Sequence, residues 1–174
     1  MIVIVLNGTA KSGKDQFVSY MKEIGDFRIK NYSSIDTVKN IALLCFGWNG
    51  KKDDKSRKFL SEIKRVWSEY NNGPFEDIIK KIETDIKYTK DVKKTLETIY
   101  FVHVREPEEI KKMKERFGNK KCITLLIKKD VDSIPDNDSD KNVNNYEYDI
   151  TIENNSGLKE FKKTAEDFSK SLIK

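Results

Sequence analysis

Two glycines and a lysine near the start of the chain have the spacing of a phosphate-binding loop. Gly8 and Gly13 flank a turn that ends in Lys14, and Ser12 adds a hydroxyl group inside the turn. Glycine lets the backbone adopt conformations that side chains forbid and approach phosphate oxygens closely, whereas lysine supplies a mobile positive charge. This stretch, Lys11 included, therefore predicts a site for the phosphates of a nucleoside triphosphate.

The residues on either side of the turn predict the elements that must hold it. An apolar run over residues 1–6 is typical of a buried strand, and apolar residues recur at helical spacing over residues 15–24. A strand, a glycine-rich turn and a helix N-terminus direct backbone N–H groups and the positive end of the helix dipole toward phosphates. A turn of this composition that binds no ligand is the alternative that the sequence leaves open.

The two residues after Lys14 bear on the metal that accompanies a triphosphate. Serine or threonine usually follows this lysine and ligates Mg²⁺ through its hydroxyl group, but this chain has Asp15 and Gln16. A carboxylate is a good oxygen ligand for Mg²⁺, so Asp15 is the metal candidate and Gln16 is a further candidate contact to the nucleotide. We therefore expect ATP and Mg²⁺ as cofactors.

Composition restricts the class of protein. The chain has 174 residues, 37% of them hydrophobic and 36% charged, and its formal net charge is +5. Apolar residues in periodic runs indicate a folded protein, and lysines spread along predicted helices argue against nucleic acid as the partner. The short apolar start predicts a core strand rather than a signal peptide or a membrane span. We therefore expect nucleotide-sized partners and no membrane contact, and leave a homodimer open.

The two cysteines, Cys45 and Cys122, each lie in an apolar run. Such cysteines are expected to be buried reduced thiols rather than members of a disulfide or a metal site. The cysteines therefore favour a reducing compartment, and we expect a cytoplasmic protein.

Predicted strands alternate with predicted helices along the chain. The predicted strands cover residues 1–6, 27–32, 98–104, 122–127 and 148–152. The predicted helices cover residues 15–24, 37–46, 53–70, 75–86, 107–117 and 158–173. This alternation predicts an α/β fold, a three-layer sandwich in which helices cover both faces of a parallel sheet of about five strands.

Two segments interrupt this alternation within a single predicted domain, residues 1–174. Residues 36–90 form a helical insertion, whose long helix is expected to pack through a face that includes Val66 and Tyr70. Residues 128–146 are polar, rich in Asp and Asn, and predict a long lid-like loop, with a disordered segment as the alternative. Because ligands of parallel sheets bind beyond the carboxyl ends of the strands, we expect the site at this edge, with the helical insertion binding the acceptor and the loop closing over the phosphates.

Phosphoryl transfer also needs cations from other segments to neutralise the charge that develops between the phosphates. Arg105 directly follows a predicted strand and is the candidate second catalytic cation, with an ion pair to a neighbouring glutamate as the alternative. Arg57 and Arg65 lie two turns apart on the long helix, facing either an acceptor phosphate or solvent. Lys128 and Lys129 follow another strand and are candidate lid residues, although surface solubility explains them nearly as well.

These motifs resemble the phage-type deoxynucleoside monophosphate kinases, which have the P-loop nucleoside monophosphate kinase fold, and more loosely phosphomevalonate kinase. The likeness covers most of the chain. It rests on Gly-Lys-Asp in residues 8–15, Ile-Asp-Thr-Val-Lys at 35–39, Val-Arg-Glu-Pro-Glu-Glu at 104–109 and Tyr-Asp-Ile-Thr-Ile-Glu-Asn at 148–154. The resemblance implies ATP-dependent phosphoryl transfer to a nucleoside or deoxynucleoside monophosphate in a bacterial or phage-infected cell.

The resemblance also implies roles for single residues. Asp36 and Lys39 are expected near the acceptor nucleotide, Arg105 at a phosphate, and Asn154 near the base of the donor. These roles join Lys14, which is expected to serve the triphosphate.

Two positions depart from the family pattern. Gln16 stands where the family often has Thr, and His103 stands where it often has Asp. Both positions bear on Mg²⁺ and its waters, and a histidine late in a buried strand is more often a hydrogen-bonded structural residue than a base. The departures keep open a nucleotide-binding module with weak or no catalysis. Because the sequence does not show a base-reading pocket, a kinase of another small phosphorylated metabolite is a second alternative.

Overall fold

The structure is a computed structural model that describes residues 1–89, 96–130, 143 and 145–173. The chain forms two compact units. We call Met1–Asn31 together with Lys94–Lys174 the sheet unit, and Tyr32–Lys93 the helical unit. The helical unit contains the helices expected as an insertion, and most of the expected lid, residues 131–142 and 144, lies outside the described residues.

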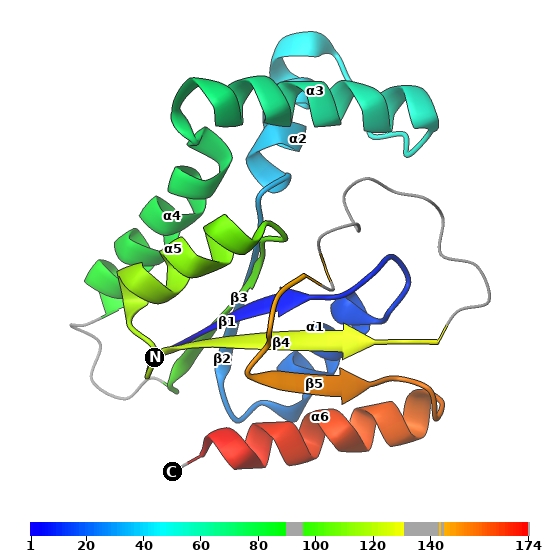
Figure 1. Ribbon diagram of the computed structural model, residues 1–174, viewed down its shortest axis with the longest axis vertical. Helices are drawn as coiled ribbons and strands as arrows, with labels where there is room; N and C mark the ends of the chain where they lie inside the picture. Colours follow the sequence, from blue (N-terminus) through cyan, green and yellow to red (C-terminus); the bar gives the residue numbers. More distant parts are fainter. Residues whose placement is uncertain (90–95, 131–142, 144, 174) are drawn as a thin grey trace. The chain divides into compact units, whose positions relative to one another are not determined.

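The sheet has five strands in the order β2-β3-β1-β4-β5. Their bounds are β1 (Ile2–Asn7), β2 (Arg28–Ser33), β3 (Thr98–His103), β4 (Cys122–Lys128) and β5 (Ile150–Glu153). β1 pairs in parallel with both β3 and β4, and β4 pairs in parallel with β5, so the arrowheads of β1, β4 and β5 point the same way in Figure 1. The predicted parallel α/β architecture is confirmed.

Helices cover both faces of this sheet. Helices α1 (Lys14–Ile24) and α6 (Leu158–Leu172) pack together on one face, and α5 (Pro107–Phe117) lies against β1 and β4 on the other (Figure 1). The three inner strands, β3, β1 and β4, are mostly apolar and buried because both faces of the sheet are covered, as is usual for parallel sheets. On α5 the burial falls on Ile110 and Met113, one turn apart.

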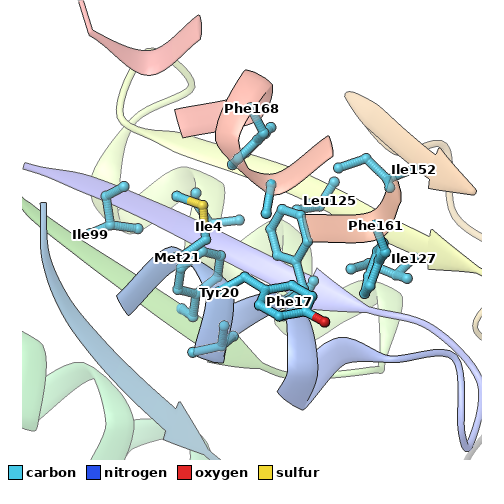
Figure 2. Close-up of a cluster of buried hydrophobic side chains, with 14 of the residues drawn as sticks. Ile4, Phe17, Tyr20, Met21, Ile99, Leu125, Ile127, Ile152, Phe161 and Phe168 are labelled. Atoms are coloured by element: carbon cyan, nitrogen blue, oxygen red, sulfur yellow. The ribbon is translucent and has the colours of Figure 1, made fainter. Parts of the chain in front are cut away.

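An aromatic cluster fixes α1 against the sheet (Figure 2). The ring centroid of Phe17, on α1, lies 6.3 Å from that of Phe101, 5.8 Å from that of Phe161 and 5.5 Å from that of Phe168. Truncating a buried phenylalanine to alanine typically costs about 3–5 kcal/mol. Because Phe17 lies one turn after the predicted phosphate-binding loop, this core holds the end of the loop in place.

The helical unit has a smaller core. The unit consists of α2 (Asp36–Phe46), α3 (Asp54–Asn71) and α4 (Gly73–Thr89). Val38, Ala42 and Leu60 are buried between α2 and α3. The corner between α3 and α4 is tight, because a Cβ atom on Gly73 would overlap the Trp67 ring.

Three predicted burials in the helical unit are wrong. Val66 is 55% exposed and Tyr70 is 83% exposed, because α3 turns Leu60 rather than these residues into its core. Cys45 is exposed, because it lies in the last turn of α2, beyond Ala42, the last buried residue of that helix. The prediction for Cys122 is confirmed: this thiol is buried on β4, and burial raises its pKa to about 11.

Candidate functional site

The predicted phosphate-binding loop lies at the carboxyl edge of the sheet. It connects the end of β1 at Asn7 to the start of α1 at Lys14, and β1 is the central strand. The residue before α1, Gly13, provides no side-chain cap. The N–H groups of the first helical turn therefore point out of the helix without an intrahelical partner, in the arrangement that binds anions.

Both glycines of the loop are required by the packing around them. Gly8 has φ 149°, and a Cβ atom there would overlap the carbonyl oxygen of Ile127 and lie 2.6 Å from Ser12 Oγ. Gly13 has φ 101°, and a Cβ atom there would lie 2.5 Å from Asn154 Nδ2. The loop thus rests directly on the ends of β4 and β5, which leaves no room for larger residues.

The Lys14 ammonium lies within the loop. Its Nζ donates hydrogen bonds to the carbonyl oxygens of Gly8, at 2.6 Å, and Thr9, at 2.7 Å, and lies 3.4 Å from Ser12 Oγ. Neutral carbonyl groups are weaker partners for an ammonium than phosphate oxygens are. A phosphate that enters the loop therefore gains a cation that is already in position.

Asn154 supports the back of the loop. Its Nδ2 donates to the carbonyl oxygen of the fully buried Ser12 at 2.9 Å, and its backbone N–H donates to the Lys128 carbonyl oxygen at 2.7 Å. The structure thus gives this amide a partner in the loop, which the sequence did not indicate. The expected role of Asn154 near the donor base stays a prediction.

A second contact behind the loop was also missed. Asn7 is buried, and its Oδ1 accepts the Gly8 N–H at 2.9 Å while its Nδ2 donates to the Tyr148 hydroxyl at 2.7 Å. The available signal was a lone asparagine at the end of an apolar strand, because a buried amide needs partners. Which partner it would find, 141 residues away, had no signal in the sequence.

Arg105 follows β3, the neighbour of β1, and precedes α5. Because β3 runs parallel to β1, a residue that follows β3 lies at the same edge of the sheet as the loop. The Arg105 side chain is half-buried. Two residues earlier, His103 Nε2 lies 2.8 Å from Asn31 Oδ1. The histidine thus has the hydrogen-bond partner expected of a structural residue, while the catalytic role of Arg105 stays a prediction.

The candidate lid residues end β4. Lys128 is its last residue, Lys129 follows, and both side chains are exposed. The next residue, Asp130, is tied to the turn after β5: its N–H donates to Asn155 Oδ1, and Asn155 Nδ2 donates to its carboxylate, both at 2.9 Å. The backbone on both sides of Lys129 is therefore held in place, by β4 before it and by the Asp130–Asn155 hydrogen bonds after it.

The donor set fits a magnesium ion that arrives with a triphosphate. Asp15 and Gln16 are exposed in the first turn of α1, and both carry oxygen atoms of the kind that Mg²⁺ prefers. Within the described part of the chain, no group of three or more His, Cys, Asp or Glu side chains is placed to hold a metal. Mg²⁺ often binds through one or two carboxylates plus substrate phosphates, so one carboxylate at this position is compatible with a metal site. The metal role of Asp15 stays a prediction.

Two acceptor candidates lie at the start of α2. The Asp36 carboxylate accepts the Ser33 N–H at 2.7 Å, and Lys39 lies one turn further along the helix. Both side chains are half-buried. Their roles at an acceptor stay predictions.

The arginines of α3 bind carboxylates of their own helix. Arg57 Nη1 lies 3.4 Å from Asp54, and Arg65 lies 2.9 Å from Glu62 and 2.8 Å from Glu69. The hydrogen bonds to Glu69 and Glu62 raise the pKa of the Arg65 guanidinium. These contacts favour the solvated-helix alternative, and the acceptor role of both arginines stays a prediction.

A polar cluster on the α5 side of the sheet anchors the chain as it enters β5. Asp149 accepts hydrogen bonds from Lys114 Nζ at 2.8 Å and from the N–H and hydroxyl of Thr124 at 2.7 and 2.8 Å. Burial raises the pKa of this carboxyl, but the hydrogen bonds outweigh burial and leave the pKa below its usual value. A cavity of about 580 Å³ lined by α5 and Tyr146 contains none of the predicted site residues.

Comparison with known proteins identifies the fold. No protein-family model matches the chain, and no curated protein matches it. Shikimate kinase from Aquifex aeolicus is similar in structure, with a TM-score of 0.50 and 16% identity over 98% of this chain and 97% of that one. A gluconokinase from Sinorhizobium meliloti has a TM-score of 0.50 and 12% identity over 98% and 93% of the two chains.

The chain has the P-loop kinase fold. At identities this low the likeness establishes the fold and no activity. None of the helices in the described residues is long and apolar enough to cross a membrane.

Proposed function

We propose that the protein is an ATP-dependent phosphotransferase whose acceptor is a nucleoside or deoxynucleoside monophosphate. The observation that carries this proposal is the Lys14 ammonium held inside a glycine loop at an uncapped helix N-terminus. The kinase fold supports it, because this loop follows the central strand at the edge where parallel sheets bind ligands.

In this proposal the protein's part in catalysis is positioning and charge neutralisation. The N–H groups of the loop bind the phosphates of ATP, and the Lys14 ammonium contacts the β- and γ-phosphates. Asp15 holds Mg²⁺, which neutralises phosphate charge when bound. Arg105, from the strand next to β1, supplies a second cation as charge develops between donor and acceptor.

The acceptor part of the proposal rests on the resemblance and on charge. The segments at residues 35–39 and 104–109 match the phage-type kinases, and they supply Asp36, Lys39 and Arg105. An acceptor phosphate is already anionic, so its transfer step needs no general base. The lack of need for a base agrees with the structural contact of His103, whose Nε2 is hydrogen-bonded to Asn31.

Two alternatives are supported by particular observations. The compared proteins are named as kinases of shikimate and gluconate, which favours a different small acceptor on the same fold. Gln16 and His103, where the resembled family often has Thr and Asp, favour instead a module that binds nucleotide without transferring phosphate.

The test is Mg²⁺-dependent ADP production from ATP against a panel of nucleoside and deoxynucleoside monophosphates, with ATP binding followed by calorimetry. Turnover that depends on one of these acceptors is the expected result. Turnover only on a second panel of other small metabolites, with shikimate and gluconate among them, would assign the first alternative. ATP binding without turnover on either panel would assign the binding module, and absence of ATP binding would overturn all three.

A further inference from the structure

A chain of three hydrogen bonds runs from the segment before β5 to the first glycine of the loop. The Tyr148 hydroxyl donates to the Val143 carbonyl oxygen at 2.9 Å and accepts from Asn7 Nδ2 at 2.7 Å. Asn7 Oδ1 then accepts the Gly8 N–H at 2.9 Å. Val143 and Asn7 are each 1% exposed and Tyr148 is half-buried, so the Asn7–Gly8 bond at the end of the chain is shielded from water.

The direction of this chain is fixed by the number of protons available. A tyrosine hydroxyl has one proton, and Tyr148 donates it to a carbonyl group, so Asn7 must present its NH₂ to Tyr148. The amide oxygen of Asn7 is thereby turned toward Gly8. Burial raises the pKa of Tyr148 to about 12, which keeps the proton on the hydroxyl at ordinary pH.

The chain ends on the residue that holds the lysine of the site. The N–H of Gly8 is bound by Asn7, and the carbonyl group of Gly8 accepts the Lys14 ammonium at 2.6 Å. Gly8 cannot be held by packing of a side chain, and its φ of 149° lies in a region that glycine alone visits readily. The side chain of Asn7 therefore restrains the most permissive residue of the loop.

We propose that Asn7 and Tyr148 are positioning residues for the phosphate-binding loop, which set the Gly8 peptide so that Lys14 and the loop N–H groups are in place before nucleotide binds. This inference rests on the proposed function, because its readout is nucleotide affinity. It makes the strand-end asparagine and a tyrosine 141 residues away parts of the same binding site, although neither contacts the ligand.

The test uses two variants and a matched control in the full-length protein. Tyr148→Phe removes the hydroxyl and leaves Asn7 Nδ2 without its acceptor. Asn7→Leu removes both hydrogen bonds of the Asn7 side chain and keeps a side chain of similar volume. Thr124→Val is the control, since it loosens the same segment by removing the two hydrogen bonds between its hydroxyl and Asp149, keeps the bond from its backbone N–H, and touches no loop residue. Calorimetry measures the Kd of ATP with Mg²⁺, and NMR measures hydrogen exchange of the Gly8 amide.

We expect Tyr148→Phe to weaken ATP binding about three- to tenfold and Asn7→Leu about tenfold or more, because loss of a buried hydrogen bond leaves its partner unsatisfied. The Gly8 amide should exchange faster in both variants. Combining them should add little to Asn7→Leu alone, since both act through one chain. Thr124→Val should change the Kd of ATP less than about twofold, which is ordinary for a site that does not couple to the loop.

The outcomes separate this inference from the proposed function. Equal losses of affinity in Tyr148→Phe and Thr124→Val would overturn the inference, because general loosening would then explain both. Faster Gly8 exchange with unchanged ATP affinity would overturn it as well. If the unmodified protein binds no ATP, the proposed function fails first, and the inference is overturned as a statement about nucleotide binding, whatever the Gly8 amide does.

Discussion

The sheet unit and the helical unit hold their candidate residues in opposite ways. In the sheet unit, Lys14 donates to carbonyl groups of its own loop, and the buried residues Asn7 and Asn154 hold that loop from behind. In the helical unit, Arg57 and Arg65 are exposed and pair with carboxylates one turn away on the same helix.

This difference between buried and exposed contacts indicates which residues already have their binding conformation before a ligand arrives. Residues confined by buried contacts have lost their conformational entropy during folding, so binding does not have to order them again. Exposed arginines in surface ion pairs keep rotamer freedom and gain little from their pairing. Substitutions in the loop should therefore affect function strongly, and substitutions on the exposed face of α3 should affect it weakly.

The largest expected effect is that of Lys14→Ala. Removing the ammonium takes away the cation at the centre of the loop, and we expect turnover to fall by at least about 10²–10³-fold, as for other single groups that stabilise developing charge. Lys22→Ala, in the last turn of the same helix and exposed, is the control and should keep turnover within about twofold. Unchanged turnover in Lys14→Ala, measured by ADP release, would remove the functional contrast between the units.

A second test compares two glycines at the ends of α1. Gly13→Ala forces a positive φ on alanine and drives its Cβ atom to within 2.5 Å of Asn154 Nδ2, so we expect a loss of about 2–5 kcal/mol of stability. Gly25→Ala also has positive φ but meets nothing within 4 Å, so about 1–2 kcal/mol is expected. Urea unfolding measures both, and equal losses would show that the loop is not tightly packed against β5.

Local patterns sufficed for the loop and the sheet. The first strand, the glycine turn and the helix after it follow one another in sequence, so spacing alone indicated how Gly8, Gly13 and Lys14 are arranged. Strand and helix periodicity likewise predicted the parallel sheet, because both faces of each central strand are apolar.

Contacts between distant segments could not be predicted in the same way. Asn7 and Tyr148 are 141 residues apart, and Asn154 and Ser12 are 142 apart, with no pattern in the sequence that pairs an amide with its partner. The exposed Cys45 and Tyr70 show a related limit. An apolar stripe predicts which face of a helix packs, but not where the partner helix ends.

A third test concerns the charged cluster at the start of β5, where burial and hydrogen bonding shift the pKa of Asp149 in opposite directions. The folded pKa of Asp149 lies below the ordinary aspartate value of 3.8, so its contribution to stability is present above that value and is lost as pH falls through the folded pKa. We expect Asp149→Asn to be less stable at pH 7 and to lose less stability on acidification. Urea unfolding between about pH 7 and pH 2 measures the slope.

Asp167→Asn is the control for this test, because its exposed carboxylate lies 3.9 Å from Lys170 on the surface of α6. It should follow the acid dependence of the unmodified protein. If Asp149→Asn did the same, the hydrogen bonds from Lys114 and Thr124 would not favour the ionised carboxylate, and this cluster would resemble the surface pairs of α3.

The smallest expected effect is that of Arg65→Ala. Its side chain is 53% exposed and shared between Glu62 and Glu69, so its loss should change stability by less than about 1 kcal/mol and the acceptor KM by less than about twofold. Lys39→Ala, on the half-buried side of α2, should instead raise the acceptor KM about tenfold with the ATP KM unchanged, as expected for loss of one charge-assisted bond. If both variants raised the acceptor KM equally, the ion pairs of Arg65 with Glu62 and Glu69 would not prevent this arginine from binding the acceptor. Exposed residues of the helical unit would then be as well placed for function as the buried loop, and preorganisation would not be what distinguishes the two units.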